Sequence, residues 1–202
     1  MDIEYHDLFP TVVGVSNIGR SFKKEEIDTV HGLEFIQNIG NSLSTNTNVL
    51  DIQALSEIKK FCLESIAIYV KQIINPKNDL LIKITQSWIN VTDKNQSHHR
   101  HNHPNSFISG SFYIETDDRD KITFYNPKQP IYEIESEEFT PYNSGQWWMP
   151  AKTGNLLLFP STLEHSVETK KHEGYRVSLS FNTQLIGTIG SKQKLTELIL
   201  RG

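Results

Sequence analysis

Four histidines lie within one short stretch of the sequence, at His98, His99, His101 and His103. Side chains two residues apart in an extended segment point to the same side of the chain. His101 and His103 can therefore bind one metal ion together, and so can His99 and His101. Imidazole nitrogen is a ligand for zinc, iron, nickel and copper. The stretch predicts a metal site.

A second stretch, residues 154–182, supplies the candidate partners of this cluster. His165 comes shortly after an apolar segment, in a polar turn that leaves its ring free to approach a metal. As a third ligand it would close one face of an octahedron and leave positions open for substrate and oxygen. A lone histidine there would more often be a hydrogen-bonded core residue, but the nearby His-x-His pattern favours the metal. His172 lies in the charged turn KKHEG, and we expect it to be solvated.

Arg176 lies on the polar face of the alternating segment 174–182. A guanidinium group can bind a carboxylate through two parallel hydrogen bonds. Ser178 shares this face and could donate to the same carboxylate, and the hydroxyl of Tyr113 could do so as well. On the strand alone, a solvent-facing arginine is an equally good interpretation. Together with the histidines, these residues predict an acid-shaped co-substrate beside the metal.

Helices are expected mainly in the first part of the chain. Residues 51–75 carry apolar side chains at steps of three and four, which predicts an amphipathic helix. Asp51 can cap its start, and the Asn-Pro pair that follows can end it. Residues 21–40 predict a second helix from a capping serine to a terminal glycine, and residues 192–200 predict a short third one.

Strand patterns fill the rest of the chain. They occur at residues 8–16, 80–91, 107–115, 121–127, 131–134, 155–159 and 174–182. Early helices followed by many short strands predict a mainly β (α+β) fold, an antiparallel sandwich or barrel with the N-terminal helices packed on its outside. We expect one domain, with support over 1–78, a β core over 79–187 and a tail over 188–202.

Composition excludes several functional classes. The net charge of −4 gives no indication of a nucleic-acid partner. A single cysteine, Cys62, excludes a disulfide framework within the chain and fits a reducing compartment. We found no apolar run long enough for a membrane span and no signal peptide, so we expect a cytoplasmic protein. The acidic segment 133–138 is interpreted as a solvated loop in preference to a lid.

At these motifs the sequence resembles the Fe(II)/2-oxoglutarate-dependent oxygenases, in the prolyl-4-hydroxylase-like branch. The family pattern is His-x-Asp, then a strand with a tyrosine, then a distant histidine followed by arginine or lysine. Here it reads His101-Asn102-His103, Tyr113, His165 and Arg176. The segments SWINV, HNHPNSFISGSFYI and LLLFPSTLEHSV resemble a group of such oxygenases common in marine bacteria and their phages. The resemblance covers residues 80–187.

The resemblance implies a double-stranded β-helix (a cupin-like jelly roll) that uses Fe(II) and 2-oxoglutarate. It is also compatible with ascorbate as an additional cofactor. It implies decarboxylation of 2-oxoglutarate coupled to C–H hydroxylation of a small-molecule or peptide substrate. The resemblance is compatible with a homodimer. If a phage encodes the chain, it is also compatible with a location in the host cytoplasm. The implied catalytic iron ligands are His101, His103 and His165, and the implied co-substrate residues are Arg176, Tyr113 and Ser178. Trp88 and Asn90 belong to the matching motif without an assigned role.

His103 stands where the family has a carboxylate. Three neutral imidazoles leave the iron one charge unit more positive than two imidazoles and a carboxylate do. This keeps open a three-histidine site without 2-oxoglutarate: another dioxygenase, a cupin-like isomerase, or a binding module that holds Zn, Ni or Mn. Asp93 and Glu164 could offer a carboxylate but lack the expected spacing. Asn182 and Trp148 are interpreted equally as pocket-lining or as structural residues.

Overall fold

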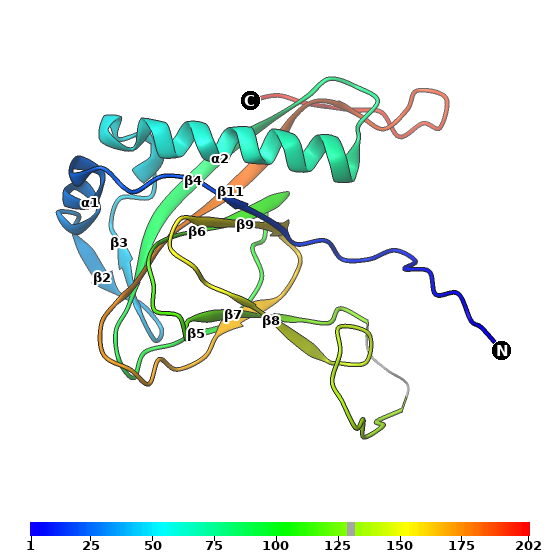
Figure 1. The fold of residues 1–202 in the computed structure, drawn as a ribbon. Coiled ribbons are helices and arrows are strands. Elements are labelled where there is room, and N and C mark those ends of the chain that lie inside the picture. Colours follow the sequence, from blue (N-terminus) through cyan, green and yellow to red (C-terminus); the bar gives the residue numbers. More distant parts are fainter. Residues whose placement is uncertain (129–131) are drawn as a thin grey trace.

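Two antiparallel β-sheets face each other, and a long helix lies across the outer face of the larger sheet (Figure 1). The computed structural model describes residues 1–128 and 132–202. In this part of the chain the larger sheet has eight strands, ordered β1-β9-β6-β11-β4-β3-β2, with β12 paired to β11. They are β1 (Gly14–Asn17), β2 (Phe35–Gln37), β3 (Ser42–Ser44), β4 (Leu80–Thr92), β6 (Ile108–Glu115), β9 (Asn155–Pro160), β11 (Arg176–Ile189) and β12 (Leu198–Leu200).

The smaller sheet is ordered β5-β10-β7-β8. Its strands are β5 (His98–His101), β7 (Lys121–Tyr125), β8 (Gln146–Pro150) and β10 (His165–Val167). From β4 onward the chain crosses repeatedly between the sheets, with β4, β6, β9 and β11 in the larger one and β5, β7, β8 and β10 in the smaller one. This path is that of a jelly roll, or double-stranded β-helix. The expected mainly β fold class is confirmed.

Strand β11 joins the two halves of the larger sheet, pairing with β4 along one edge and with β6 along the other. Its alternation sends Val177, Leu179 and Phe181 to the outer face, where all three are buried. Gly110 of β6 lies opposite Phe181, and a Cβ atom there would come 2.1 Å from Cζ of that ring. Glycine at this position therefore lets the phenylalanine ring pack directly against the backbone of β6.

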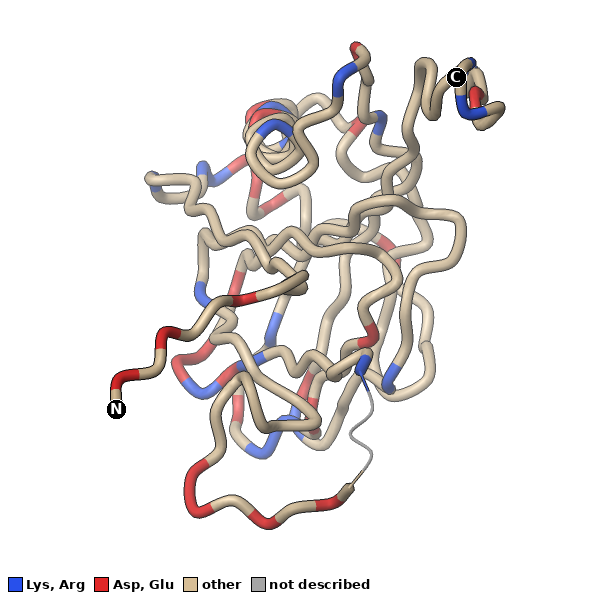
Figure 2. Tube along the Cα trace, turned by 90° about the vertical axis from the view of Figure 1, so that its right-hand side faces the viewer, with Lys and Arg blue, Asp and Glu red and all other residues tan. Residues whose placement is uncertain are grey.

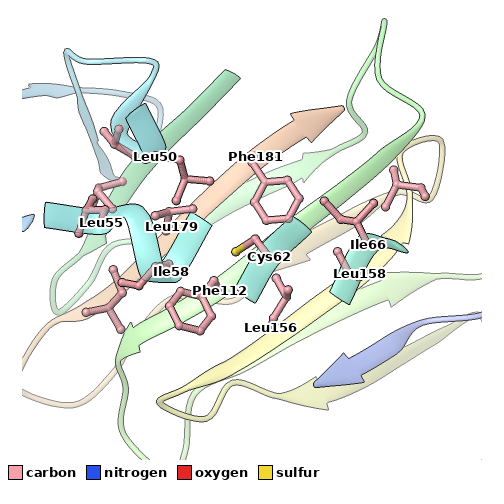
Figure 3. Close-up of a cluster of buried hydrophobic side chains, with 14 of the residues drawn as sticks. Leu50, Leu55, Ile58, Cys62, Ile66, Phe112, Leu156, Leu158, Leu179 and Phe181 are labelled. Carbon is pink, nitrogen blue, oxygen red and sulfur yellow. The ribbon is translucent and has the colours of Figure 1, made fainter. Parts of the chain in front are cut away.

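The outer face is covered by α2 (Ser56–Tyr69), whose apolar stripe has the predicted spacing. Ile58, Cys62 and Ile66 are at most 1% exposed and point at Phe112 and Phe181 of the sheet (Figure 3). Burying an isoleucine side chain contributes about 1.5–3 kcal/mol, so this stripe is a main source of stability. Burial raises the pKa of the Cys62 thiol, which keeps it protonated and unreactive.

A second, smaller core fills the space between the sheets. Tyr113 and Phe159 come from the larger sheet and Ile122 and Phe124 from the smaller one. The larger sheet is therefore buried on both faces, and in β6 every residue from Ile108 to Ile114 is buried. The polar side chains that project between the sheets belong to the candidate site.

The helices begin and end differently from the prediction. α1 spans only Lys24–His31, because Gly32 ends it and the chain then enters β2. Residue 51 does not cap α2 either, since two 3₁₀ turns (Val49–Asp51 and Gln53–Leu55) precede the helix. At its other end α2 continues as a π-helical turn, Val70–Ile74, and stops as predicted before the Asn-Pro pair.

The predicted C-terminal helix over 192–200 is wrong. Residues 198–200 form β12, which pairs with the end of β11, and the segment before them is a turn. Tertiary pairing overrides a weak helical pattern of three apolar residues. The strand predicted over 131–134 begins outside the described residues, and 132–134 are irregular. The opening strand is shorter than predicted, and β11 extends seven residues beyond the prediction, from 182 to 189. The sequence patterns also missed the short strands β2, β3, β5, β8 and β10.

Many charged residues lie along the extended N-terminal segment and in the loops (Figure 2), but Glu26, Asp120, Lys170 and Arg176 are buried. Several acidic residues follow one another in the long loop between β7 and β8, next to the part drawn in grey. No helix in the described residues is long and apolar enough to cross a membrane.

Candidate metal centre

His101, His103 and His165 come together between the two sheets. His101 ends β5 and His165 begins β10, and the two are opposed in the antiparallel register of these strands. His103 follows β5 in a loop, where its N–H donates to the carbonyl of Ser161 at 2.9 Å. One ring nitrogen from each histidine lies within 4.8 Å of the other two. The structure therefore groups the three predicted metal residues; their role as ligands stays a prediction.

Hydrogen bonds to carbonyl groups fix the protonation of two of the rings. Nδ1 of His101 lies 2.7 Å from the carbonyl oxygen of His99. Nδ1 of His165 lies 3.0 Å from the carbonyl oxygen of Leu163. Because a carbonyl oxygen can only accept, each Nδ1 must carry the proton in the neutral ring, and each Nε2 then has a free lone pair. This is the tautomer of a histidine that binds metal through Nε2.

The ring of His103 is held in the same way by a side chain. Its Nδ1 lies 2.6 Å from Oδ1 of Asn182, to which the Ser109 hydroxyl also donates at 3.3 Å. Nε2 of His103 is thus unprotonated in the neutral ring and lies 3.3 Å from Nε2 of His165. Two lone pairs cannot hydrogen-bond each other, but two nitrogens bound to one metal at about 2.1 Å would be about 3.0–3.4 Å apart. The residues present therefore fit a metal ion.

The protonation states of the rings also suit a metal. Burial lowers the pKa of His165 to about 3 and that of His103 to about 4, from an ordinary 6.5. The nearby His101, whose protonated form would repel theirs, lowers both values further, and burial lowers the pKa of His101 as well. All three imidazoles are therefore neutral at pH 7. Metal binding then displaces no ring proton.

Arg176 lies at the other end of the same face of β11. Six residues separate it from Asn182, so both side chains project toward the space between the sheets, with their Cα atoms about 20 Å apart along the strand. Arg176 is 4% exposed, and its Nη1 donates to Oδ1 of Asp120 at 3.3 Å. Among the described residues its buried Nη2 has no hydrogen-bond partner. One arm of the guanidinium is therefore free to bind a carboxylate.

Tyr113 and Ser178 face each other across β6 and β11, and both are buried. Tyr113 and Arg176 lie close enough for each to shift the pKa of the other. Burial raises the pKa of the Tyr113 hydroxyl, which therefore stays a donor. His98 lies next to the metal residues. Its ring stacks on that of His101, with the two ring centroids 4.3 Å apart. Burial, then its three neighbouring histidines and lastly Arg176 lower the pKa of His98 to about 3.

Trp88 and Asn90 lie next to the metal residues. The Trp88 ring stacks on that of His103 at 5.9 Å, and its Nε1 donates to Oδ1 of Asn90 at 3.3 Å. Asn90 in turn donates to the hydroxyl of Ser180 at 2.9 Å. These contacts fix β4 against β11 beneath the ring of His103.

Other candidates lie apart from the metal residues. Glu164 pairs with Arg100, and Asp93 accepts a hydrogen bond from the main chain at 2.6 Å. Among the described residues, the group that could hold a metal contains no carboxylate. His99 is exposed, and Trp148 is 52% exposed beneath the ammonium of Lys121.

Sequence reasoning missed Asp120 and placed His172 wrongly. Asp120 is 4% exposed and accepts a hydrogen bond from the N–H of Asp117 in the turn before β7. The His172 side chain is only 12% exposed, not solvated, and its Nε2 lies 3.6 Å from Oδ1 of Asp120. The buried Lys170 donates to the main-chain carbonyls around His172 and holds this turn against the protein. A charged turn on its own gave no signal for this packing.

Residues 86–182 match the model of a family described as "Putative 2OG-Fe(II) oxygenase". The match includes every residue predicted to hold the metal or the co-substrate. Over this segment, just under half of the chain, the sequence is similar to this oxygenase family. The resemblance to Fe(II)/2-oxoglutarate-dependent oxygenases is thereby confirmed, and members of the family are oxidoreductases. No curated protein matches the chain.

Solved structures of such oxygenases share the fold. An oxidoreductase of the 2OG-Fe(II) oxygenase family from Burkholderia pseudomallei is 12% identical with a TM-score of 0.55, covering 78% of this chain and 75% of its own. HygX from Streptomyces hygroscopicus, with nickel, 2-oxoglutarate and hygromycin B bound, is 11% identical with a TM-score of 0.58, covering 86% and 82%. The carbocyclase SnoK from nogalamycin biosynthesis is 10% identical with a TM-score of 0.57, covering 86% and 79%. At these sequence identities, the likeness shows that this chain shares the jelly-roll fold of those oxygenases.

Proposed function

We propose that the chain is a non-haem Fe(II)- and 2-oxoglutarate-dependent dioxygenase that hydroxylates a C–H bond of a small molecule or peptide. One observation carries this proposal. Three unprotonated Nε2 atoms converge between the sheets, and the same face carries a buried arginine with a free donor, Arg176. The family match of the segment supports it, as does the 2-oxoglutarate bound to nickel-loaded HygX.

In this mechanism the chain's own residues would bind the metal and the co-substrate and orient the histidine rings. The three histidines would hold iron, which with 2-oxoglutarate and oxygen supplies the oxidative chemistry. Asn182 and the carbonyls of residues 99 and 163 keep each Nε2 aimed at one point. Arg176 would bind the far carboxylate of 2-oxoglutarate through Nη2, with Tyr113 and Ser178 as further donors. Phe159, whose ring lies 4.8 Å from that of His165, shields the metal side from water.

The missing carboxylate supports a second candidate function. Because the metal group consists of three neutral imidazoles, it would bind zinc or nickel without any co-substrate. The chain would then be a metal-binding module or a cupin-like isomerase. Similar folds also serve different reactions, since the structural relatives include the epimerase SnoN and the carbocyclase SnoK. Hydroxylation is thus the part of the proposal that needs the most direct test.

An anaerobic titration separates these functions. Metal-free protein receives Fe(II) and then 2-oxoglutarate, and the visible spectrum is followed. A weak metal-to-ligand charge-transfer band should appear only when both are present. Arg176→Ala should weaken the 2-oxoglutarate dependence of this band, whereas Lys83→Ala, on an exposed position of β4, should not. Iron binding that 2-oxoglutarate leaves unchanged would refute the dioxygenase and favour the module or isomerase. Succinate release with oxygen then reports turnover.

A further inference from the structure

His101 lies at an irregular edge of the candidate metal centre. It ends β5, which is an edge strand of the smaller sheet with β10 as its neighbour. His101 lies opposite His165 and His98 lies opposite Val167, so β5 takes three steps where β10 takes two. The extra residue forms a β-bulge, which disrupts the hydrogen-bond ladder locally. The backbone ladder therefore holds His101 less firmly than a regular strand pair would.

Arg100 lies on the solvent-facing side of this edge. His98 and His101 are partly buried with their rings stacked, whereas the Arg100 side chain between them is 47% exposed. Glu164, the residue before the buried His165, is 44% exposed on the same side. Nε of Arg100 donates to Oε2 of Glu164 at 3.0 Å, and Nη2 donates to the same oxygen. The ion pair thus joins the residue before one predicted ligand to the residue before another.

A third strand takes part in this contact. The guanidinium carbon of Arg100 lies 4.0 Å from the ring centroid of Tyr125, the last residue of β7. The N–H of Tyr125 donates to the carbonyl of Glu164 at 3.0 Å, and its hydroxyl lies 2.9 Å from that of Ser166. A guanidinium group over an aromatic face is attracted by the ring quadrupole. Arg100 therefore connects β5 to β10 and β7 at the level of the metal residues.

The other two predicted ligands have supports that do not involve Arg100. The N–H of His103 donates to the carbonyl of Ser161 at 2.9 Å. His165 lies between two neighbouring strands, because its β10 pairs with β7 as well as with β5. Loss of Arg100 should therefore loosen one ligand of the three and leave the remaining two in place.

We propose that Arg100 is a positioning residue for the metal centre. Its ion pair with Glu164 and its contact with the Tyr125 ring fix the end of β5. The fixed strand end holds His101 at the spacing that a metal ion shared with His165 requires. This inference rests on the metal-binding part of the proposed function and does not depend on 2-oxoglutarate.

The effect of Arg100 on metal binding should exceed its effect on folding. An ion pair between side chains that are nearly half exposed contributes little to the free energy of unfolding. Metal affinity, in contrast, depends on ligands that are already held in the binding geometry before the metal arrives. The two quantities should therefore separate when Arg100 is replaced.

Zinc affinity, measured by competition with a chromogenic chelator, tests the inference without turnover. Arg100→Ala should weaken zinc binding about tenfold, the lower end of the loss expected when a partner that orients ligands is removed. Arg100→Lys keeps the charge but not the planar fork, so its affinity should be intermediate. Lys59→Ala breaks a partly exposed ion pair with Asp51 beside α2 and is the matched control, expected to bind zinc within about twofold of the wild type.

Two further measurements separate positioning from a general structural role. The visible spectrum of the cobalt(II)-loaded protein responds to the number and geometry of the ligands, so Arg100→Ala should change it. The thermal melt of metal-free Arg100→Ala should stay close to that of the wild type. Arg100→Glu combined with Glu164→Arg reverses the ion pair and should restore part of the zinc affinity that either single change removes.

The outcomes distinguish this inference from the proposed function. If folded Arg100→Ala binds zinc like the wild type and has the same cobalt spectrum, the inference is wrong and the dioxygenase proposal is unaffected. If wild-type protein binds neither zinc nor cobalt, both are wrong. If zinc binding depends on Arg100 but 2-oxoglutarate never changes the spectrum of the iron-loaded protein, the dioxygenase proposal fails and the positioning role stands. Glu164→Gln removes the same ion pair from the neighbouring strand and provides the answer should Arg100→Ala unfold.

Discussion

Metal-free protein should lose stability as the pH falls from 7 to 5, and His165 should account for a definable share of the loss. In the folded chain, burial and then the neighbouring His101 lower the pKa of His165 to about 3. In the unfolded chain its pKa returns to about 6.5. Between these two values the unfolded state binds more protons than the folded state. This contribution is therefore fully present above pH 6.5 and is lost as the pH falls toward 3.

The size of the effect follows from the two pKa values. At pH 5 the unfolded ring is protonated and the folded ring is still neutral, which lowers the free energy of unfolding by about 2 kcal/mol relative to pH 7. The limiting slope is about 1.4 kcal/mol per pH unit for one imidazole. His103, with a folded pKa of about 4, adds a similar contribution. The rings of His103 and His165 lie 5.1 Å apart, so their titrations are coupled and the two losses do not simply add.

Urea unfolding at pH 7, 6 and 5, after removal of metal by a chelator, measures this loss. His165→Gln should lose about 2 kcal/mol less than the wild type between pH 7 and 5, because it cannot take up the proton. His6→Gln is the control, since the His6 side chain is already 69% exposed in the folded chain. Equal pH dependence in His165→Gln and the wild type would refute the reasoning that links burial of this ring to its neutral state.

Three further predictions concern the metal site, the core and the buried ion pair. Asn182→Ala should weaken zinc binding about 10–100-fold by removing the acceptor that orients a ligand ring, and an unchanged Kd would contradict this. Gly110→Ala should lower the free energy of unfolding by about 1–3 kcal/mol, because the new methyl group meets Phe181; a urea melt like that of the wild type would show that the sheet adjusts freely. Asp120→Ala should cost about 3–5 kcal/mol by leaving a buried guanidinium unpaired, whereas exposed Asp118→Ala, the control in the same turn, should have little effect.

Local patterns predicted the parts of this protein that depend on periodicity. The apolar stripe of residues 51–75 identified α2, and strict alternation divided β6 and β11 correctly into two faces. In β11 the polar face lies between the two sheets, not toward solvent as the alternation alone suggested. The predicted helix boundaries were less accurate. Gly32 ends α1 before its apolar pattern ends, and a 3₁₀ segment delays the start of α2. β12 could not be predicted, because its strand form depends on pairing with β11.

The candidate site was predictable where spacing alone determines geometry. The pair His101 and His103 indicated a metal site, and the structure brings His165 to it through the pairing of β5 with β10. The surroundings of Arg176 were not predictable, because Asp120 and His172 reach it from turns whose packing has no sequence period. Ligand pairs that lie close together in the sequence could thus be predicted. The side chains that irregular segments bring to the site could not.

Under the proposed function, the two ends of the inner face of strand β11 carry Asn182, which would orient a metal-binding ring, and Arg176, which would bind the co-substrate carboxylate. Asn182 and Arg176 belong to the same unbroken strand, so the separation of these two anchors is set by the rise per residue and does not depend on loop conformation. Inserting one residue between them would turn one anchor toward the outer core. Inserting two would keep both facing inward but separate them by roughly another 7 Å. Discrimination between diacids of different chain length would then be a property of the sheet itself, and it would tolerate changes in the surrounding loops.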